Sequence, residues 1–119
     1  ARVIDLTVTF EVVVDPALNR SVVLQNVLKH LQAFFNIKNF NIDQPIVIDD
    51  VKGVIFSIAG IVSISALKFQ NVVGSVGTRT YSAETHDVPA NTKRGIIVPP
   101  PGGIFEVRYP DIDIIGRAV

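Results

Sequence analysis

The sequence predicts an α+β fold in which two helices pack on one face of a small, mostly antiparallel (mixed) β-sheet. Three observations lead to it. Valine (19) and isoleucine (15) are the most frequent apolar residues among the 119, which favours strands over a helical bundle. Residues 3–14 alternate between apolar and polar, as a half-buried strand does. Two later segments repeat apolar residues every three or four positions, as amphipathic helices do.

The first strand and the first helix have the clearest patterns. Pro16 ends the strand because proline has no backbone donor. Asn19 or Ser21 is placed to cap a helix that ends near Asn36. The apolar face of the strand is Ile4, Leu6, Val8, Phe10, Val12 and Val14, and that of the helix is Val23, Leu24, Val27, Leu28, Leu31, Phe34 and Phe35.

A second, shorter helix is expected after a polar connection over residues 36–45 and a short extended segment over 46–48. Asp49 or Asp50 is expected to cap it, and Gly60 to end it. Gly53 weakens it by about 1 kcal/mol relative to alanine. Its apolar positions are Val51, Val54, Ile55 and Ile58.

The C-terminal half predicts strands around one long loop. Residues 61–69 are apolar on both faces, which predicts a central strand. Residues 71–95 are expected to be a single irregular loop, of a length that is usually functional or mobile. Residues 96–98 and 104–109 are expected to pair as a hairpin around Pro-Pro-Pro-Gly-Gly, and residues 111–115 to add a final edge.

Composition excludes several classes of function and favours one domain over residues 1–119. The formal net charge is zero and the basic residues are scattered, so a nucleic-acid partner is not expected. The absence of cysteine excludes disulfides, zinc–thiolate sites and cysteine nucleophiles. The sequence contains no long apolar stretch, so a membrane partner is not expected. Methionine is absent, even at position 1, so we expect a fragment of a longer protein.

The reactive side chains do not form a recognisable catalytic or metal motif. His30 is expected to be solvated or to cap the helix. His86 lies beside Glu84 and Asp87, but residues adjacent in sequence rarely converge on one metal ion, so an ordinary loop is favoured. Two carboxylates, Asp111 and Asp113, share a face if their segment is extended; blocking of unwanted strand pairing is favoured over cation binding.

Two other motifs of enzymes are also missing from the sequence. No serine lies in a G-x-S-x-G turn, and the glycine-containing segment over residues 73–78 lacks the lysine of a phosphate-binding loop. We therefore predict no enzyme activity, and assign no catalytic, cofactor-binding or metal-binding residue. No small-molecule substrate is expected.

The segment around the three prolines is expected to be stiff. Pro99–Pro101 restrict the chain to extended conformations, and Gly102 and Gly103 permit a reversal. A rigid edge that carries apolar and amphipathic side chains suits a recognition surface. The alternative is a hairpin that only completes the core, and the residues alone leave both interpretations open.

The segment Gly95–Gly116, "GIIVPPPGGIFEVRYPDIDIIG", follows "TYSAETHDVPANTKRG", and "QPIVIDDV" occurs earlier, over Gln44–Val51. Together with the upstream order of elements, these segments resemble the C-terminal domain of the large baseplate wedge protein of contractile-tailed bacteriophages, which is related to the baseplate J-like family. The resemblance extends over essentially the whole chain.

The resemblance implies a structural protein of the virion. Proteins of that family form the scaffold of the baseplate wedge in the tail. Their C-terminal regions associate into homodimers that link neighbouring wedges into a ring, and they also contact other wedge subunits, including a sheath-initiating protein with a lysozyme-like fold. The implied location is the tail baseplate, assembled in the bacterial host cytoplasm, and the implied activity is not enzymatic.

The resemblance does not identify the contact residues. We expect them in the loop over residues 81–95 and along the final edge over residues 104–114, where a two-fold contact brings one patch against itself. The candidates are Tyr81, His86, Lys93, Arg94, Ile104, Phe105, Tyr109, Ile112 and Ile114.

Two alternatives from other classes remain. One is a small α+β ligand-binding regulatory module, in which the loop over residues 71–95 closes over a metabolite. It requires an apolar pocket of roughly 300 Å³ or more. The other is a hydrolytic or metal-assisted enzyme that uses His86, Glu84 and the Asp111/Asp113 pair.

Overall fold

The main sheet of the computed structural model, which describes residues 2–37 and 40–119, is built around its first strand, β1 (Arg2–Val14). Antiparallel to one side of β1 lies β3 (Ile61–Asn71). On the other side, β8 (Gly103–Glu106) and β9 (Ile114–Ala118) both run parallel to it. β8 pairs with residues 2–5 and β9 with residues 8–12, so the two short strands follow one another along β1, opposite β3.

Smaller elements complete the fold. Strands β2, β7 and β6 form a separate three-stranded sheet, and β4 and β5 form a two-stranded hairpin. The remaining elements are α1 (Arg20–Ile37), β2 (Ile46–Val47), α2 (Ile48–Phe56), β4 (Ser75–Val76), β5 (Arg79–Thr80), the 3-10 helix η1 (Pro89–Asn91), β6 (Thr92–Lys93), β7 (Ile96–Ile97) and α3 (Pro110–Asp113).

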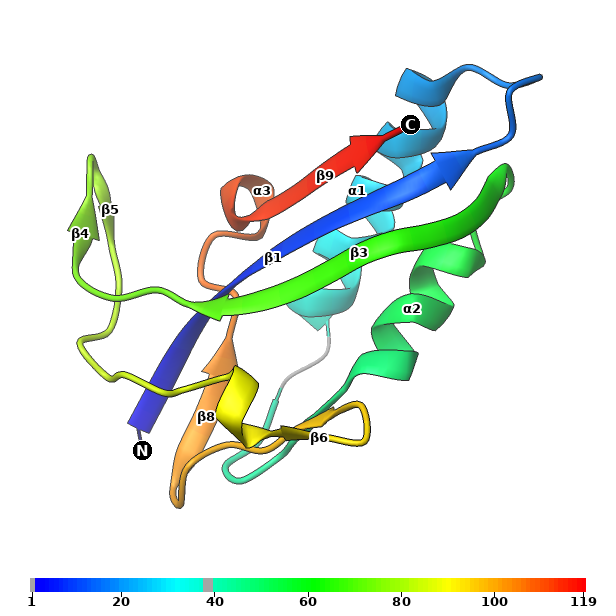
Figure 1. Cartoon of the computed structure of the whole chain (residues 1–119). Helices are drawn as coiled ribbons and strands as arrows, with labels where there is room; N and C mark the ends of the chain where they lie inside the picture. The colour runs from blue at the N-terminus through cyan, green and yellow to red at the C-terminus, as the bar shows by residue number, and fades with distance from the viewer. Residues whose placement is uncertain (1, 38–39) are drawn as a thin grey trace.

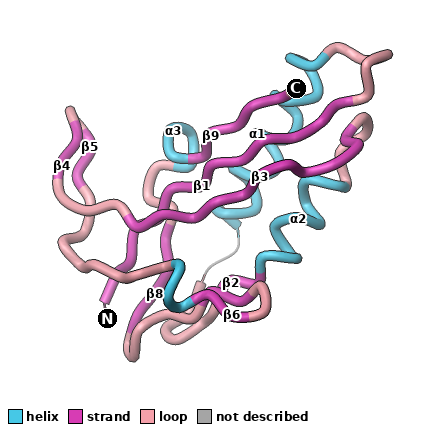
Figure 2. The backbone as a smooth tube through the Cα atoms, viewed as in Figure 1, coloured by secondary structure: helices cyan, strands magenta, loops and turns pink. Residues whose placement is uncertain are grey.

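The two longer helices cover one face of the main sheet, which confirms the predicted α+β class (Figures 1 and 2). α1 packs against β9 and α2, and α2 packs against β3. The predicted cap is also confirmed, because the Asn19 side-chain oxygen accepts a hydrogen bond from the Val22 backbone at 3.2 Å. All six predicted inward residues of β1, from Ile4 to Val14, are buried.

The second helix starts and ends earlier than predicted. It begins at Ile48, and the preceding Val47 caps it without a side-chain hydrogen bond. Asp49 and Asp50 lie in its first turn, where their negative charges interact favourably with the positive end of the helix dipole. The helix ends at Phe56, and Gly60 forms the turn into β3 with φ +98°. This positive φ requires glycine; a Cβ would also lie 2.6 Å from Leu18 Cδ1, but Leu18 is 46 % exposed and its side chain can move aside.

The prediction that residues 61–69 form the central strand is wrong. β1 is central and β3 is an edge strand, because both C-terminal strands pair with the opposite side of β1. The apolar residues on the inward face of β3 pack with α2 and the core, but Val62 remains 60 % exposed. Two of the three pairings of β1 are parallel, so this sheet is mixed.

The predicted hairpin around the three prolines is also wrong. β7 pairs with β2 and β6, whereas β8 pairs with β1, so the proline–glycine segment crosses from one sheet to the other. Asp43 fixes this crossing: its carboxylate accepts a hydrogen bond from the Gly102 backbone at 2.7 Å, and its backbone N–H donates to the Gly103 carbonyl at 2.8 Å. The three prolines offer no donors for an antiparallel ladder, and Pro101 and Gly102 form a turn closed by the Gly103 N–H, which donates to the Pro100 carbonyl at 2.8 Å.

The segment over residues 71–95 is more ordered than predicted. It contains the β4–β5 hairpin, which projects from the body in Figure 1, and then η1 and β6. Arg94 and Gly95, with φ 53° and 77°, form the two-residue turn between β6 and β7. Two positive φ values are typical of a type I′ hairpin, whose twist matches that of the strands.

Residues 111–115 do not form one extended edge. Residues 110–113 form α3, and the strand β9 starts only at Ile114. In the connection over residues 36–45, residues 38 and 39 lie outside the described part of the chain. None of the helices over the described residues has the length and apolar character needed to cross a membrane.

Candidate functional site

A buried carboxylate, Asp5 of β1, attaches the segment that follows β3 to the main sheet. Asp5 is fully buried, and its Oδ2 accepts a hydrogen bond from the Ser82 backbone N–H at 2.7 Å. Its backbone carbonyl accepts from the Val72 N–H at 2.9 Å and from the Asn71 side-chain amide at 3.0 Å. The Asn71 side-chain oxygen in turn accepts from the His86 backbone N–H at 3.0 Å. The side chains of Asp5 and Asn71 thus hold the backbone of Ser82 and His86 against the main sheet.

A second buried carboxylate, Asp113 at the end of α3, attaches the β4–β5 hairpin. It accepts hydrogen bonds from Arg79 Nη1 at 2.9 Å and from the Tyr81 hydroxyl at 2.7 Å. Burial, followed by the hydrogen bond to Asp113, raises the pKa of Tyr81. The Tyr109 ring packs edge-on against Tyr81 at 5.4 Å between centroids, and its hydroxyl accepts from the Thr80 N–H at 3.1 Å.

Asp5 also forms a pair with Glu106 of β8, its cross-strand partner. One oxygen of each carboxyl group, Asp5 Oδ1 and Glu106 Oε1, is buried without a hydrogen-bond donor among the described residues. Desolvation, followed by a hydrogen bond to Asp5 and repulsion from its charge, raises the pKa of Glu106 to about 7, although Arg108 opposes the shift. One proton shared between the two carboxyl groups satisfies both of these oxygens.

We predict that this pair makes stability depend on pH. Because the folded pKa of Glu106 lies above its ordinary value of 4.5, the folded state keeps a proton that the unfolded state releases. The stabilisation from this pair is therefore fully present below pH 4.5, is lost as pH rises through about 7, and is absent above that. Glu106 is partly exposed, so solvent reduces the effect to about 1 kcal/mol.

The Glu106→Gln variant keeps a donor towards Asp5 without a titrating proton. Urea unfolding of both proteins between about pH 5 and about pH 8.5 is expected to show a decline for the wild type that the variant lacks. Equal slopes for the two proteins would contradict the shared proton.

Asp5 and Glu106 were not among the residues singled out from the sequence. The alternating pattern placed Asp5 on the polar face of the first strand, where solvent exposure is expected. The segment that follows β3 covers this end of the face, and local polarity cannot predict such long-range coverage. The one available signal is an acidic residue between two buried apolar residues, Ile4 and Leu6.

The structure separates the nine predicted interface residues by exposure. Tyr81, Phe105 and Ile114 are buried, with exposed fractions of 6 %, 1 % and 4 %, so these three belong to the core and offer no contact surface on the folded chain. Phe105 and Ile114 point inward because parallel pairing with β1 places them beside Ile4 and Val8, on the helix-covered face. Tyr81 is buried against Tyr109 and Asp113. The partly or fully exposed ones are His86, Lys93, Arg94, Ile104, Tyr109 and Ile112.

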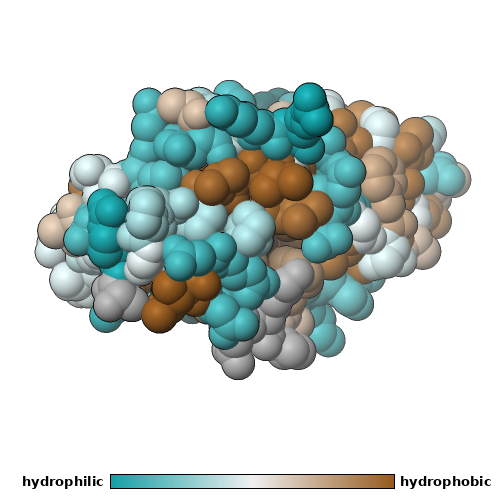
Figure 3. Space-filling model, turned by 90° about the horizontal axis from the view of Figure 1, so that it is seen from below, coloured by the Kyte–Doolittle hydropathy of each residue, from teal (hydrophilic) through white to brown (hydrophobic). Residues whose placement is uncertain are grey.

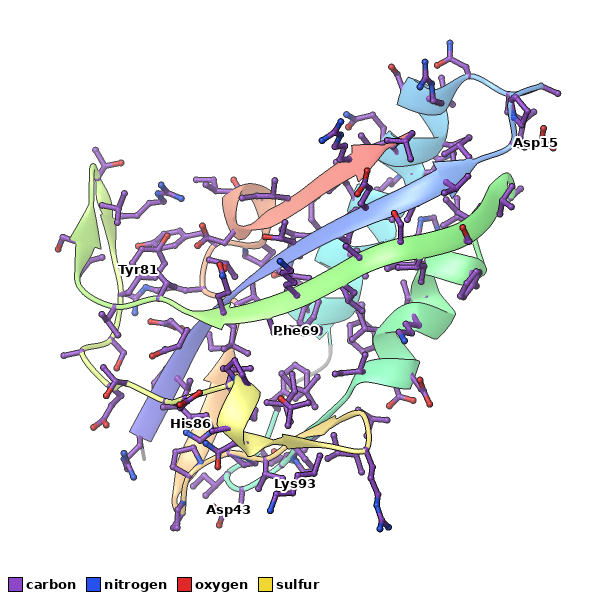
Figure 4. The ribbon with its side chains drawn as sticks, in the orientation of Figure 1. Asp15, Asp43, Phe69, Tyr81, His86 and Lys93 are labelled. Atoms are coloured by element: carbon purple, nitrogen blue, oxygen red, sulfur yellow. The ribbon has the colours of Figure 1, made fainter. Side chains whose placement is uncertain are left out.

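These residues lie in three places rather than in one patch. Tyr109 and Ile112 lie at the start of α3 and within it, and Tyr81 contacts α3 through Asp113. The His86 ring lies 5.8 Å from that of Phe105, beside β8. Lys93 and Arg94 lie at the tip of the β6–β7 hairpin, and Figure 4 shows Lys93 at a distance from Tyr81.

The groups considered for metal binding or hydrolysis are engaged separately. Glu84 pairs with Arg2 at 3.2 Å, His86 Nε2 lies 2.8 Å from the Val98 carbonyl, and Asp113 is held by Arg79. Over residues 2–37 and 40–119, no group of three or more His, Cys, Asp or Glu is arranged to hold a metal ion. His30 is exposed, as predicted, with Nδ1 2.8 Å from the Asn26 carbonyl.

The face of the main sheet opposite α1 and α2 is open to solvent. Cross-strand neighbours on this face form rows, one of which is Lys68, Thr9 and Ile115. Ile115 is 55 % exposed. The next row places Arg117 beside Glu11, with 3.9 Å between Nε and Oε1. We call this surface the open face; its residues are Thr7, Thr9, Glu11, Val13, Ala66, Lys68, Gln70, Ile115 and Arg117.

A groove borders the free edge of β3. Its volume is about 490 Å³ and its one charged lining residue is Lys68. An adjoining hollow of about 710 Å³ continues past Asn71 to His86, and the two share Phe69, Gln70, Val88 and Pro89. We call the first hollow the β3 groove; its apolar lining is Ile48, Leu67, Phe69, Val88, Pro89 and Ile97.

The sequence comparisons leave the family open. No protein-family model matches the chain, and no curated protein matches it.

Proposed function

We propose that this chain is a structural, self-associating scaffold domain of a virion, situated in the tail baseplate wedge of a contractile-tailed phage, where it links neighbouring wedges into a ring. The sequence resemblance supports the baseplate assignment. The α+β fold agrees with the class predicted from the sequence, although this class is shared by proteins of many functions.

The open face is the observation that supports self-association. A sheet covered by helices on one side only leaves its other side free to pack against a second sheet. Here that side combines short side chains with exposed Ile115 and with charges of both signs: Glu11 lies opposite Arg117, and Lys68 lies in the neighbouring row, opposite Thr9. A surface with both signs can face a copy of itself across a two-fold axis without net repulsion.

The rest of the proposal follows from a scaffold role. The partners are a second copy and the other baseplate wedge subunits, and nucleic acid, membrane and small-molecule substrates are not among them. The location is the virion tail baseplate after assembly in the bacterial host cytoplasm. The domain is not an enzyme and uses no cofactor.

The Ile115→Asp variant tests the contact surface. It places a charge on the open face, at the end of the row Lys68–Thr9–Ile115, without touching the core. We expect the dimer to become a monomer because a desolvated, unpaired carboxylate opposes association. Light scattering coupled to size-exclusion chromatography gives the mass, and circular dichroism verifies the fold.

Val22→Asp is the matched control. Val22 is 58 % exposed on α1, on the other side of the molecule, so this variant is expected to remain a dimer. Dissociation by both variants, or by neither, would contradict contact through the open face.

A second candidate function is a small ligand-binding regulatory module, and the apolar β3 groove is the observation that favours it. Its volume exceeds the roughly 300 Å³ that a small ligand needs. The protein can be screened by thermal unfolding against a library of metabolites. A compound that raises the unfolding temperature of the monomeric and dimeric protein alike would support this candidate.

A further inference from the structure

The free edge of β3 has an unused set of backbone hydrogen-bonding groups. In an antiparallel pair, alternate residues direct their backbone groups towards the partner strand. The Val72 N–H donates to the Asp5 carbonyl, so Gln70 and Lys68, at the same alternation, also face β1. The backbone groups of Leu67, Phe69 and Asn71 consequently point outward. None of these six groups has a hydrogen-bond partner among the described residues.

Only the second half of this edge is regular enough to accept another strand. The register between β1 and β3 shifts between Glu11 and Val12 and again between Val13 and Val14. The two shifts bend the first half of β3, up to about residue 65, and such bulges protect an edge from pairing. Residues 66–71 pair with β1 without a shift and span about 16 Å.

The regular half borders the β3 groove. Phe69 lines it from β3, Val88 and Pro89 line it from the segment of η1, and Ile97 lines it from β7. Figure 4 shows Phe69 between β3 and the η1–β6 segment. The molecule seen from below carries a hydrophobic area in the middle of that face, bordered by hydrophilic residues (Figure 3). The outward backbone groups therefore open into an apolar channel.

We propose that the β3 groove binds an extended peptide segment of a partner protein, which adds to the main sheet as a fifth strand beside residues 67–71. Residues of the segment opposite Leu67 and Phe69 face the apolar lining, because both side chains lie on the helix-covered side of the sheet. The intervening residue lies opposite Lys68 on the open face. The segment thus has apolar residues at alternate positions and an acidic residue between them.

Two observations favour an extended segment over a second copy of β3. The groove has a far wall, made by Val88, Pro89 and Thr92, and a second domain would bring its own wall into the same space. Antiparallel self-pairing centred on Lys68 also sets two like charges directly opposite one another, which is unfavourable. Because Lys68 is the one charged residue lining the groove, charge complementarity selects an acidic partner. This binding uses the free edge of β3 and does not require self-association, although Lys68 and Gln70 belong to both the groove and the open face.

Two synthetic peptides of ten residues test the proposal, one alternating valine and glutamate and the other alternating valine and lysine. Each is labelled with a fluorophore and titrated with the full chain, and anisotropy measures binding. The valine–glutamate peptide is expected to bind about three- to tenfold more tightly than the valine–lysine peptide. The Lys68→Glu variant is expected to reverse this order, since Lys68 is exposed and outside the core.

Amide chemical shifts locate the bound peptide. Leu67, Phe69 and Asn71 are expected to show the largest changes. A valine–glutamate peptide with N-methylated valines is expected not to bind, because it lacks the valine N–H donors that face β3. Failure of both unmodified peptides to bind at about 1 mM would overturn the proposal.

Other outcomes would overturn it too: an order of affinity that Lys68→Glu leaves unchanged, or shifts at Leu67, Phe69 and Asn71 that appear on concentrating the protein alone, since these would mean that a second copy occupies the edge. Repeating the titration with Ile115→Asp separates this result from self-association, because the peptide is expected to bind that variant with unchanged affinity.

Discussion

Replacement of Gly116 by alanine is expected to lower the free energy of unfolding by about 3 kcal/mol, as overpacking of a tight core does. Gly116 of β9 is the cross-strand partner of Phe10, whose ring lies over the glycine. A Cβ at this position would lie 2.2 Å from Phe10 Cζ and 2.7 Å from both Cε atoms. Phe10 is 2 % exposed, so its ring has no free space to move into. Thermal and urea unfolding measure the loss.

The matched control is Gly53→Ala in α2. No heavy atom lies within 4 Å of a Cβ built on Gly53, and its backbone is helical. This variant is expected to gain up to about 1 kcal/mol, because alanine has the higher helix propensity. A Gly116→Ala variant as stable as the wild type would show that β9 does not pack against Phe10 as described.

Replacement of Asp113 by alanine is expected to cost about 3 kcal/mol, the lower end of the range for breaking a buried ion pair. Asp113 accepts hydrogen bonds from both Arg79 and the Tyr81 hydroxyl, and its side chain is 4 % exposed. Its removal leaves the Tyr81 hydroxyl buried without an acceptor and releases the β4–β5 hairpin from α3. Faster amide exchange over residues 74–81 is expected together with the lower stability.

Asp111→Ala serves as the control, because Asp111 lies in the same short helix and is exposed. It is expected to change stability by less than about 0.5 kcal/mol. Similar losses for the two variants would contradict the distinct role of Asp113, and would favour the sequence-based expectation that the two carboxylates act alike.

The sequence predicts the elements with strong periodicity and fails where distant segments meet. The apolar alternation of β1 and the amphipathic pattern of α1 are local properties, and both elements form as expected. The pairing of β8 and β9 with one edge of β1 is not local. No pattern within Ile104–Tyr109 distinguishes a strand that pairs with Ile96–Val98 from one that crosses to Arg2–Asp5.

The polar residues of the site show the same limit. Asp5 and Asp113 have ordinary local contexts, yet each is buried because a segment at least 30 positions away covers it. Asp43 is different, because it stays exposed although its carboxylate holds the Gly102 backbone, 59 positions away. Burial by a distant segment converts a surface carboxylate into an anchor, and this conversion cannot be predicted from neighbouring residues.

The contact surface predicted from the sequence differs, for a related reason, from the surfaces that the fold leaves exposed. The sequence predicts Phe105 and Ile114 as contact residues on a C-terminal edge, but parallel pairing with β1 buries both. The same topology leaves the opposite edge, β3, unpaired, and leaves the open face without a covering layer. The open face and the β3 groove therefore replace the C-terminal edge as the surfaces available to a scaffold.

Sedimentation equilibrium of the wild-type chain tests self-association most directly. Across concentrations from roughly micromolar to roughly millimolar, the weight-average mass is expected to rise from that of a 12.9 kDa monomer to twice that value and to stop there, as a closed two-fold contact requires. A monomer at every concentration would contradict the scaffold account, and so would a mass that keeps rising without a limit.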